Sequence, residues 1–142
     1  MTTTYEQDFY LWLKETVVAL RSRNWTELDV DNLVEEVEAM GRSERRALES
    51  NLIIVLMHLL KYQSQVGRRS KSWVYSIQEH RCRLNKYLLE SPSLRPYLEK
   101  IFAECHERAR RLASSETGLD IEVFPEAPYT IEQALDVNFL PE

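Results

Sequence analysis

The stretch SNLIIVLMHLLKY, residues 50–62, contains a nine-residue apolar run that is interrupted by His58 alone and ends at Lys61. Apolar positions recur through it at helical spacing and predict a helix from about residue 43 to residue 63. The side chains expected to point inward are Leu48, Leu52, Val55 and Leu59. A run of this length cannot span a membrane. We therefore expect a core helix and no membrane segment.

Glycine and proline, which interrupt regular structure, are rare in the first ninety residues. Only Gly41 and Gly67 occur there, and the first proline is Pro92. No window alternates apolar and polar residues as a half-buried strand does. The sequence therefore predicts an all-α protein, with four or five helices in a bundle over residues 1–118.

The five helices are expected to begin near Tyr5, near Asp29 or Asp31, and near Ser43, Ser72 and Ser91. Gly41 is expected to end or bend the second helix, and Gly118 to end the fifth. Helical spacing predicts inward faces for the first two helices. These faces consist of Phe9, Leu13, Val17 and Leu20 in the first helix, and of Leu33, Val37 and Met40 in the second.

Residues 119–142 contain three prolines and no basic residue. They predict an extended acidic arm that packs on the bundle. Thr130 and Gln133 form a capping-box pattern, which indicates one short helix within the arm. The side chains expected to anchor the arm are Phe124, Tyr129, Phe139 and Leu140.

A length of 142 residues fits one domain, and 44% hydrophobic with 29% charged residues is typical of a globular protein. The two cysteines, Cys82 and Cys105, do not form a CxxC motif, so neither a disulfide framework nor a thiolate zinc site is indicated. The N-terminal sequence has no secretory pattern. These features predict a cytoplasmic protein.

The sequence contains no motif that is typical of a metal or cofactor site. Val55, Ile77 and Ala103 stand three residues before the histidines, so the Glu-x-x-His pattern of di-iron bundles is missing. HExxH, the G-x-S-x-G elbow and glycine-rich phosphate loops are missing too. We expect no metal, no cofactor and no nucleotide hydrolysis of a standard kind.

A polar seam along the edge of the apolar helix offers the only acid–base candidates. His58 lies on the strip of Asn51 and Lys61, and Glu36 lies at the edge of the preceding helix. If Glu36 meets His58 or Lys61 across two helices, the three side chains could form a catalytic pocket. The favoured interpretation is a histidine at the core edge with one satisfied hydrogen bond.

Charge is distributed in opposite blocks. Residues 61–86 contain seven Lys or Arg and one Glu, whereas residues 112–142 contain seven carboxylates and no Lys or Arg. Aromatic residues interleave the basic block, as in surfaces that bind nucleic acids or other polyanions. The candidate contacts are Lys61, Arg68, Arg69, Lys71, Arg81 and Arg83. A basic loop balanced by the acidic arm is the favoured alternative.

Six ordered pieces of the sequence resemble one family. They are DFYLWL (8–13), NLVEEVEAMGRSERRALESNL (32–52), HLLKYQ (58–63), RSKSW (69–73), SPSLRP (91–96) and FPEAPYTIEQALDVNFLPE (124–142). Together they resemble the domain of unknown function 29 family, small bacterial proteins frequent in cyanobacteria. The resemblance implies an all-helical domain and brings no activity, cofactor or catalytic residue.

Three functions follow as hypotheses. The favoured one is a non-enzymatic protein-interaction or adaptor module, with another protein or a second copy of the chain as its partner. The alternatives are polyanion binding through residues 61–86 and an enzyme that uses Glu36, His58 and Lys61.

Overall fold

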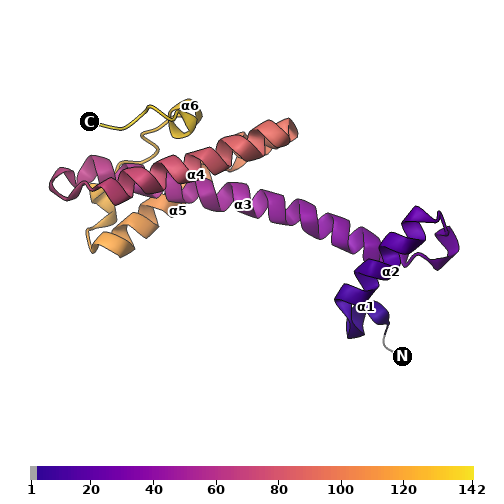
Figure 1. The fold of residues 1–142 in the computed structure, drawn as a ribbon. Helices are drawn as coiled ribbons and strands as arrows, with labels where there is room; N and C mark the ends of the chain where they lie inside the picture. Colours follow the sequence, from indigo (N-terminus) through magenta and orange to yellow (C-terminus); the bar gives the residue numbers. More distant parts are fainter. Residues whose placement is uncertain (1–2) are drawn as a thin grey trace. The chain divides into compact units, whose positions relative to one another are not determined.

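The computed structural model describes residues 3–142 (Figure 1). Within them the chain forms six α-helices and four short 3-10 turns and no strand, which confirms the predicted all-α class. Contacts within the chain divide it into two compact units, Met1–Ser43 and Glu44–Glu142. The single-domain organisation of the chain stays a prediction.

The first unit contains α1 (Thr4–Gln7), α2 (Phe9–Arg21), the 3-10 turn η1 (Trp25–Glu27) and the first turns of α3 (Val30–Ser64). The prediction of one helix from residue 5 to residue 23 is wrong, because the chain breaks at Asp8. The Asp8 carboxylate accepts a hydrogen bond from the backbone N–H of Leu11 at 3.0 Å and caps α2. A side-chain cap of this kind stabilises a helix start by about 1 kcal/mol.

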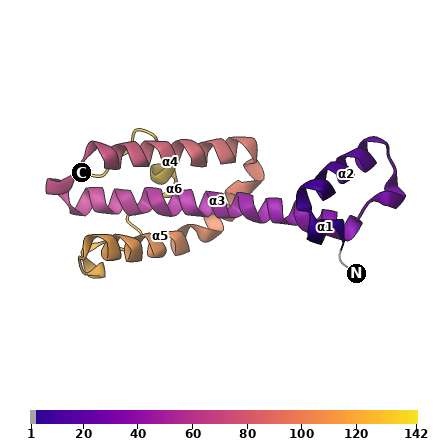
Figure 2. The same ribbon diagram turned by 60° about the horizontal axis from the view of Figure 1, so that its bottom comes forward.

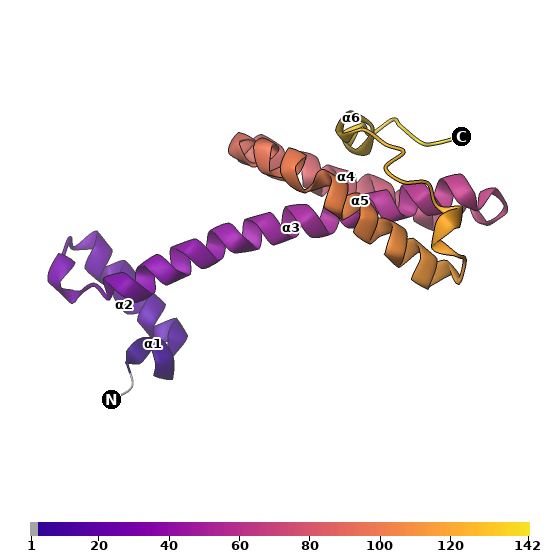
Figure 3. The same ribbon diagram turned by 180° about the vertical axis from the view of Figure 1, so that it is seen from behind.

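The predicted end of a helix at Gly41 is also wrong, since α3 runs from Val30 to Ser64 without interruption (Figure 3). A glycine in a helix interior costs about 1 kcal/mol, which is too little to end a long helix. Arg42 also links the turns around the glycine. Its guanidinium lies 2.9 Å from the Glu35 carboxylate and 3.9 Å from that of Glu38.

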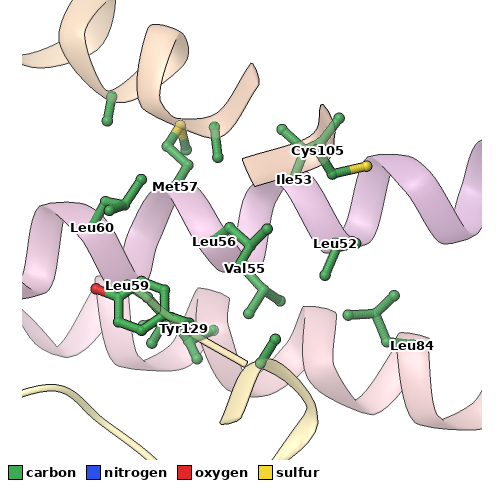
Figure 4. Close-up of a cluster of buried hydrophobic side chains, with 14 of the residues drawn as sticks. Leu52, Ile53, Val55, Leu56, Met57, Leu59, Leu60, Leu84, Cys105 and Tyr129 are labelled. Atoms are coloured by element: carbon green, nitrogen blue, oxygen red, sulfur yellow. The ribbon is translucent and has the colours of Figure 1, made fainter. Parts of the chain in front are cut away.

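The second unit is built around the later part of α3, which lies between α4 (Lys71–Glu90) and α5 (Arg95–Thr117) (Figure 2). The four side chains that were predicted to point inward, Leu48, Leu52, Val55 and Leu59, are completely buried. Leu84 of α4, Cys105 of α5 and Tyr129 of the arm belong to the same cluster (Figure 4). The apolar run is thus covered from several directions.

The remaining turns follow local rules that the sequence carries. The 3-10 turns η2 (Val66–Arg68) and η3 (Pro92–Leu94) connect the long helices. Gly118 ends α5 in the left-handed conformation, with φ at 76°, as predicted. The arm then forms η4 (Ile121–Val123) and α6 (Ile131–Leu135), and α6 begins with the predicted capping box of Thr130 and Gln133.

Two buried arginines hold the arm by its backbone. The Arg81 guanidinium of α4 donates to the carbonyl oxygens of Ala134, Phe139 and Gln133 at 2.9, 2.7 and 3.1 Å. Arg110 of α5 donates in the same way to two carbonyl oxygens at the start of the arm, those of Phe124 and Ile121, at 2.9 and 3.2 Å. The donors of Arg81 thus meet three carbonyl oxygens, and those of Arg110 meet two carbonyl oxygens and the carboxylate of Glu107 at 3.0 Å.

The predicted apolar anchors of the arm are partly confirmed. Phe124 and Tyr129 are buried, and Phe139 packs against the core cluster. Leu140 is exposed, and its prediction as an anchor is wrong. The backbone contacts of Arg81 and Arg110 hold the arm together with these apolar side chains.

Replacing Arg81 tests whether these hydrogen bonds hold the arm. Arg81→Met leaves three carbonyls without donors, and we expect the free energy of unfolding to fall by on the order of 3 kcal/mol. Hydrogen exchange of the amides in residues 130–140 should speed up. Arg83→Met is the matched control, since Arg83 makes only an exposed ion pair with Glu79, which contributes less than about 1 kcal/mol. Equal effects of both changes would contradict the assignment.

Candidate functional site

The inner edge of the first unit is aromatic. Trp12 of α2 is only 4% exposed and Ala19 is also buried. The Trp12 ring meets the ring of Tyr5 edge-on, with centroids 4.9 Å apart, and stacks on that of Phe9 at 5.8 Å. Tyr5 and Trp12 therefore form the aromatic part of the interior of this unit.

Glu36 belongs to this inner edge. Its carboxylate accepts a hydrogen bond from the hydroxyl of Tyr5. This hydrogen bond is the first cause that raises the pKa of Tyr5, followed by burial and by the negative charge of Glu36. The role that the structure gives Glu36 is to bind α1 to α3.

The first helix was predicted to bury Phe9, Leu13, Val17 and Leu20, and this prediction is wrong for residues 3–43 taken as a unit. All four side chains are exposed by more than a third. At 100° per residue they share one side of α2 with Tyr10, which is 70% exposed. We call Phe9, Tyr10, Leu13, Val17 and Leu20 the α2 stripe.

A second apolar row lies on the first turns of α3. Val30, Val34 and Val37 share one side of the helix, with Met40 beside them, and all four are about half exposed or more. The prediction that Val37 and Met40 point inward is therefore wrong. We call Val30, Val34, Val37 and Met40 the α3 stripe.

The acid–base hypothesis required Glu36 to face His58 or Lys61 from a different helix. All three residues lie instead on α3. Glu36 belongs to the first unit and His58 to the second, so their pairing stays a prediction. Within the second unit, His58 and Lys61 lie about one turn apart on α3.

His58 sits half-buried beside Lys61. Burial first, and then the positive charge of Lys61, lowers the pKa of His58, while the charge of Glu116 opposes the shift. Its Nδ1 is buried and has no hydrogen-bond partner among the described residues. The favoured interpretation of His58 as a core-edge histidine with one satisfied hydrogen bond did not assign that bond to a ring nitrogen and stays a prediction.

Lys61 is a buried cation with two partners in the second unit. Its Nζ lies 2.7 Å from a carboxylate oxygen of Glu116 on α5 and 4.7 Å from the ring centre of Trp73 on α4. A buried ammonium requires such pairing. Lys61 therefore joins three helices, and the acidic block meets the basic block at this point.

The basic side chains of residues 61–86 differ in whether they already have partners within the protein. Lys61 and Arg81 are buried and paired, and Arg83 pairs with Glu79 on the surface. Within residues 3–142, Arg68 and Lys71 form no ion pair, whereas Arg69 contacts Tyr62. Polyanion binding through the basic segment stays a prediction.

The turn before α4 has a shallow hollow of about 380 Å³, lined by Tyr62, Arg69, Lys71 and Tyr75 among others. The Arg69 guanidinium lies 4.0 Å from the ring centre of Tyr62 and donates to that residue's carbonyl oxygen at 2.8 Å. The hollow offers a cation and aromatic rings but, being shallow, little enclosure.

The described residues do not cluster the side chains that a metal site needs, and the buried cysteine does not have a reactive thiol. Among residues 3–142 no group of three His, Cys, Asp or Glu side chains is placed to hold a metal ion. Burial raises the pKa of the Cys105 thiol to about 12, so this cysteine is not a thiolate near neutral pH.

His106 is a buried histidine that the sequence patterns did not single out. It is 1% exposed, and both ring nitrogens lack hydrogen-bond partners among the described residues. Its ring stacks on Tyr129 of the arm, with centroids 5.6 Å apart, and meets Phe102 edge-on. Burial is the main cause that lowers its pKa, and nearby Arg110 adds to the shift.

The comparisons with known proteins give one match. The family model described as "Domain of unknown function DUF29" matches residues 4–140. No curated protein and no solved structure matches the chain. In the part of the chain that the structure describes, none of the helices combines the length and apolar character of a membrane span.

Lys61 and Glu116 can be tested as a matched pair. Glu116→Gln leaves the ammonium buried without its counter-charge, and we expect the free energy of unfolding to fall by about 1–2 kcal/mol, since Glu116 is half exposed. Lys61→Met removes the charge together with the need for a partner, and its effect should be within about 1 kcal/mol of zero. Urea unfolding measures both. A larger loss for Lys61→Met than for Glu116→Gln would contradict this assignment.

His106 should make stability depend on pH. Its folded pKa lies below the ordinary 6.5, so the unfolded chain takes up a proton first as the pH falls. The free energy of unfolding is therefore highest above that pH and decreases as the pH falls below it toward the folded pKa. His58 contributes in the same direction.

His106→Leu should reduce this slope and leave stability near neutral pH equal or higher, because two unpartnered nitrogens are removed. Urea unfolding between about pH 5.5 and 7.5 covers the range around the ordinary histidine pKa. An unchanged slope in the variant would show that His106 is not the group responsible.

Proposed function

The chain belongs to the domain of unknown function 29 family, and we propose that it acts as a non-enzymatic protein-interaction or adaptor module. The observation that carries this proposal is the exposure of the α2 and α3 stripes in the first unit. Nine apolar side chains on one 43-residue unit, each exposed by more than a third, are unusual for a surface that meets only water. Such residues mark surfaces that another protein covers.

The α2 stripe is shaped to receive side chains. A shallow apolar hollow of about 400 Å³ is lined by Tyr10, Leu13, Val17 and Val18, with Lys14 at its border. Apolar residues at i, i+3 and i+7 along one helix, as at Tyr10, Leu13 and Val17, are usual anchors for helix-in-groove recognition. The hollow supports docking of a helix against α2.

The second unit, in contrast to the first, covers its main apolar run with its own elements. Its apolar run on α3 is covered by α4, α5 and the arm, and its core cluster is closed. The unit thus has an interior of its own, and we assign the docking role to the first unit. We also propose that the module works in the cytoplasm, as cysteine usage predicts.

Leu13→Glu/Val17→Glu tests the proposal. Both residues lie on the exposed stripe, so the far-UV circular dichroism and the urea midpoint should change little. The carboxylates should weaken every association of the chain, with itself or with another protein, by at least roughly tenfold, about 1.4 kcal/mol. The measurement is light scattering together with affinity purification from the source cells.

Tyr75→Glu/Leu89→Glu is the control, since it places the same charges on exposed positions of the second unit. Associations that survive Leu13→Glu/Val17→Glu unchanged, or that respond equally to the control, would refute a docking role for the α2 stripe.

A further inference from the structure

The two stripes of the first unit carry charges of opposite sign along their edges. At 100° per residue, Arg21 and Lys14 come directly after Tyr10, the last member of the α2 stripe in that sense of rotation. Asp31 and Glu38 come directly after the α3 stripe in the same sense of rotation. The α2 stripe therefore has a basic edge, and the α3 stripe has an acidic edge.

The two edges have the same spacing. Lys14 and Arg21 are seven residues apart, and so are Asp31 and Glu38. Seven residues are close to two helical turns, or about 10.5 Å. A helix with one edge can thus place both of its charges against both charges of an antiparallel helix with the other.

These charges are available for a partner. All four side chains are exposed. Within residues 3–142, Lys14, Arg21 and Asp31 form no ion pair, and Lys14 lies only above the ring of Tyr10. Glu38 meets Arg42 at the long distance of 3.9 Å. The edges are therefore not neutralised inside the unit.

We propose that the partner of this surface is a second copy of the chain. In the resulting dimer the α2 stripe of each protomer packs on the α3 stripe of the other, so that each basic edge faces an acidic edge. A two-fold interface requires that surface i meets surface j while j meets i. The first unit carries both halves of such a match, which a surface made for an unrelated protein would not need.

This inference rests on the proposed function and names its partner. The two are separable, because the stripes can serve as a docking surface for another protein even if the chain does not pair with itself. Apolar contact supplies most of the affinity in either case, whereas the charged edges select the partner and its register.

Charge reversal in the full chain tests the dimer. Lys14→Glu/Arg21→Glu makes both edges acidic, and Asp31→Lys/Glu38→Lys makes both basic. Each variant alone should dimerise at least roughly tenfold more weakly than the unmodified chain, since like charges then face each other. An equimolar mixture should restore the dimer as a heterodimer, because each acidic edge meets a basic one.

Sedimentation velocity over a range of protein concentrations measures the dimer, and one variant with a fluorescent label reports the heterodimer. Lys86→Glu/Lys100→Glu is the control for Lys14→Glu/Arg21→Glu, as it changes the net charge by the same amount on exposed residues of the second unit and should leave dimerisation unchanged.

Three results would overturn the inference. They are a monomeric unmodified chain, dimerisation that is indifferent to both reversals, and a mixture of the two variants that stays monomeric. If another protein still binds and is lost in Leu13→Glu/Val17→Glu, the proposed function stands while the dimer fails. If that variant loses no association of any kind, both proposals fail.

Discussion

The burial of one apolar helical run holds the second unit together. The apolar side chains within residues 52–60 of α3 are covered on several sides by other elements. Buried polar groups nearby hold these covering elements in place. Lys61 ends the run and is neutralised by Glu116. Arg81 and Arg110 extend from α4 and α5 to the carbonyl oxygens of the arm. These charged side chains thus connect the helices and the arm inside the second unit.

The first unit differs from the second in how many of its apolar side chains are exposed. Its interior consists of little more than Trp12, Ala19 and the partly buried Tyr5, while the nine side chains of the α2 and α3 stripes are exposed. A chain of about forty residues buries a smaller fraction of its surface than a larger domain does. Association with another surface would bury the rest, and the matched charges on the two stripes give that association a direction.

Local rules in the sequence predicted much of the fold. The capping box at Thr130 and the end of α5 at Gly118 are confirmed, because both depend on neighbouring residues only. The inward face of Leu48, Leu52, Val55 and Leu59 is confirmed as well, and α4, α5 and the arm cover it. Tertiary contacts decided the rest. Arg81 resembles an anion-binding residue in the sequence, and only the position of the arm makes it a buried donor. The α2 stripe has the pattern of a core helix, and periodicity alone does not reveal whether its cover lies within the same chain.

The most direct measurement is the concentration dependence of side-chain labelling by hydroxyl radicals in the full chain. Our account predicts that Tyr10, Leu13 and Met40 become protected as the protein concentration rises, while the exposed residues Tyr75 and Leu89 of the second unit keep a constant labelling rate. Constant labelling of the stripes across the range, or equal protection of Tyr75 and Leu89, would contradict the claim that the first unit is the surface through which this chain associates.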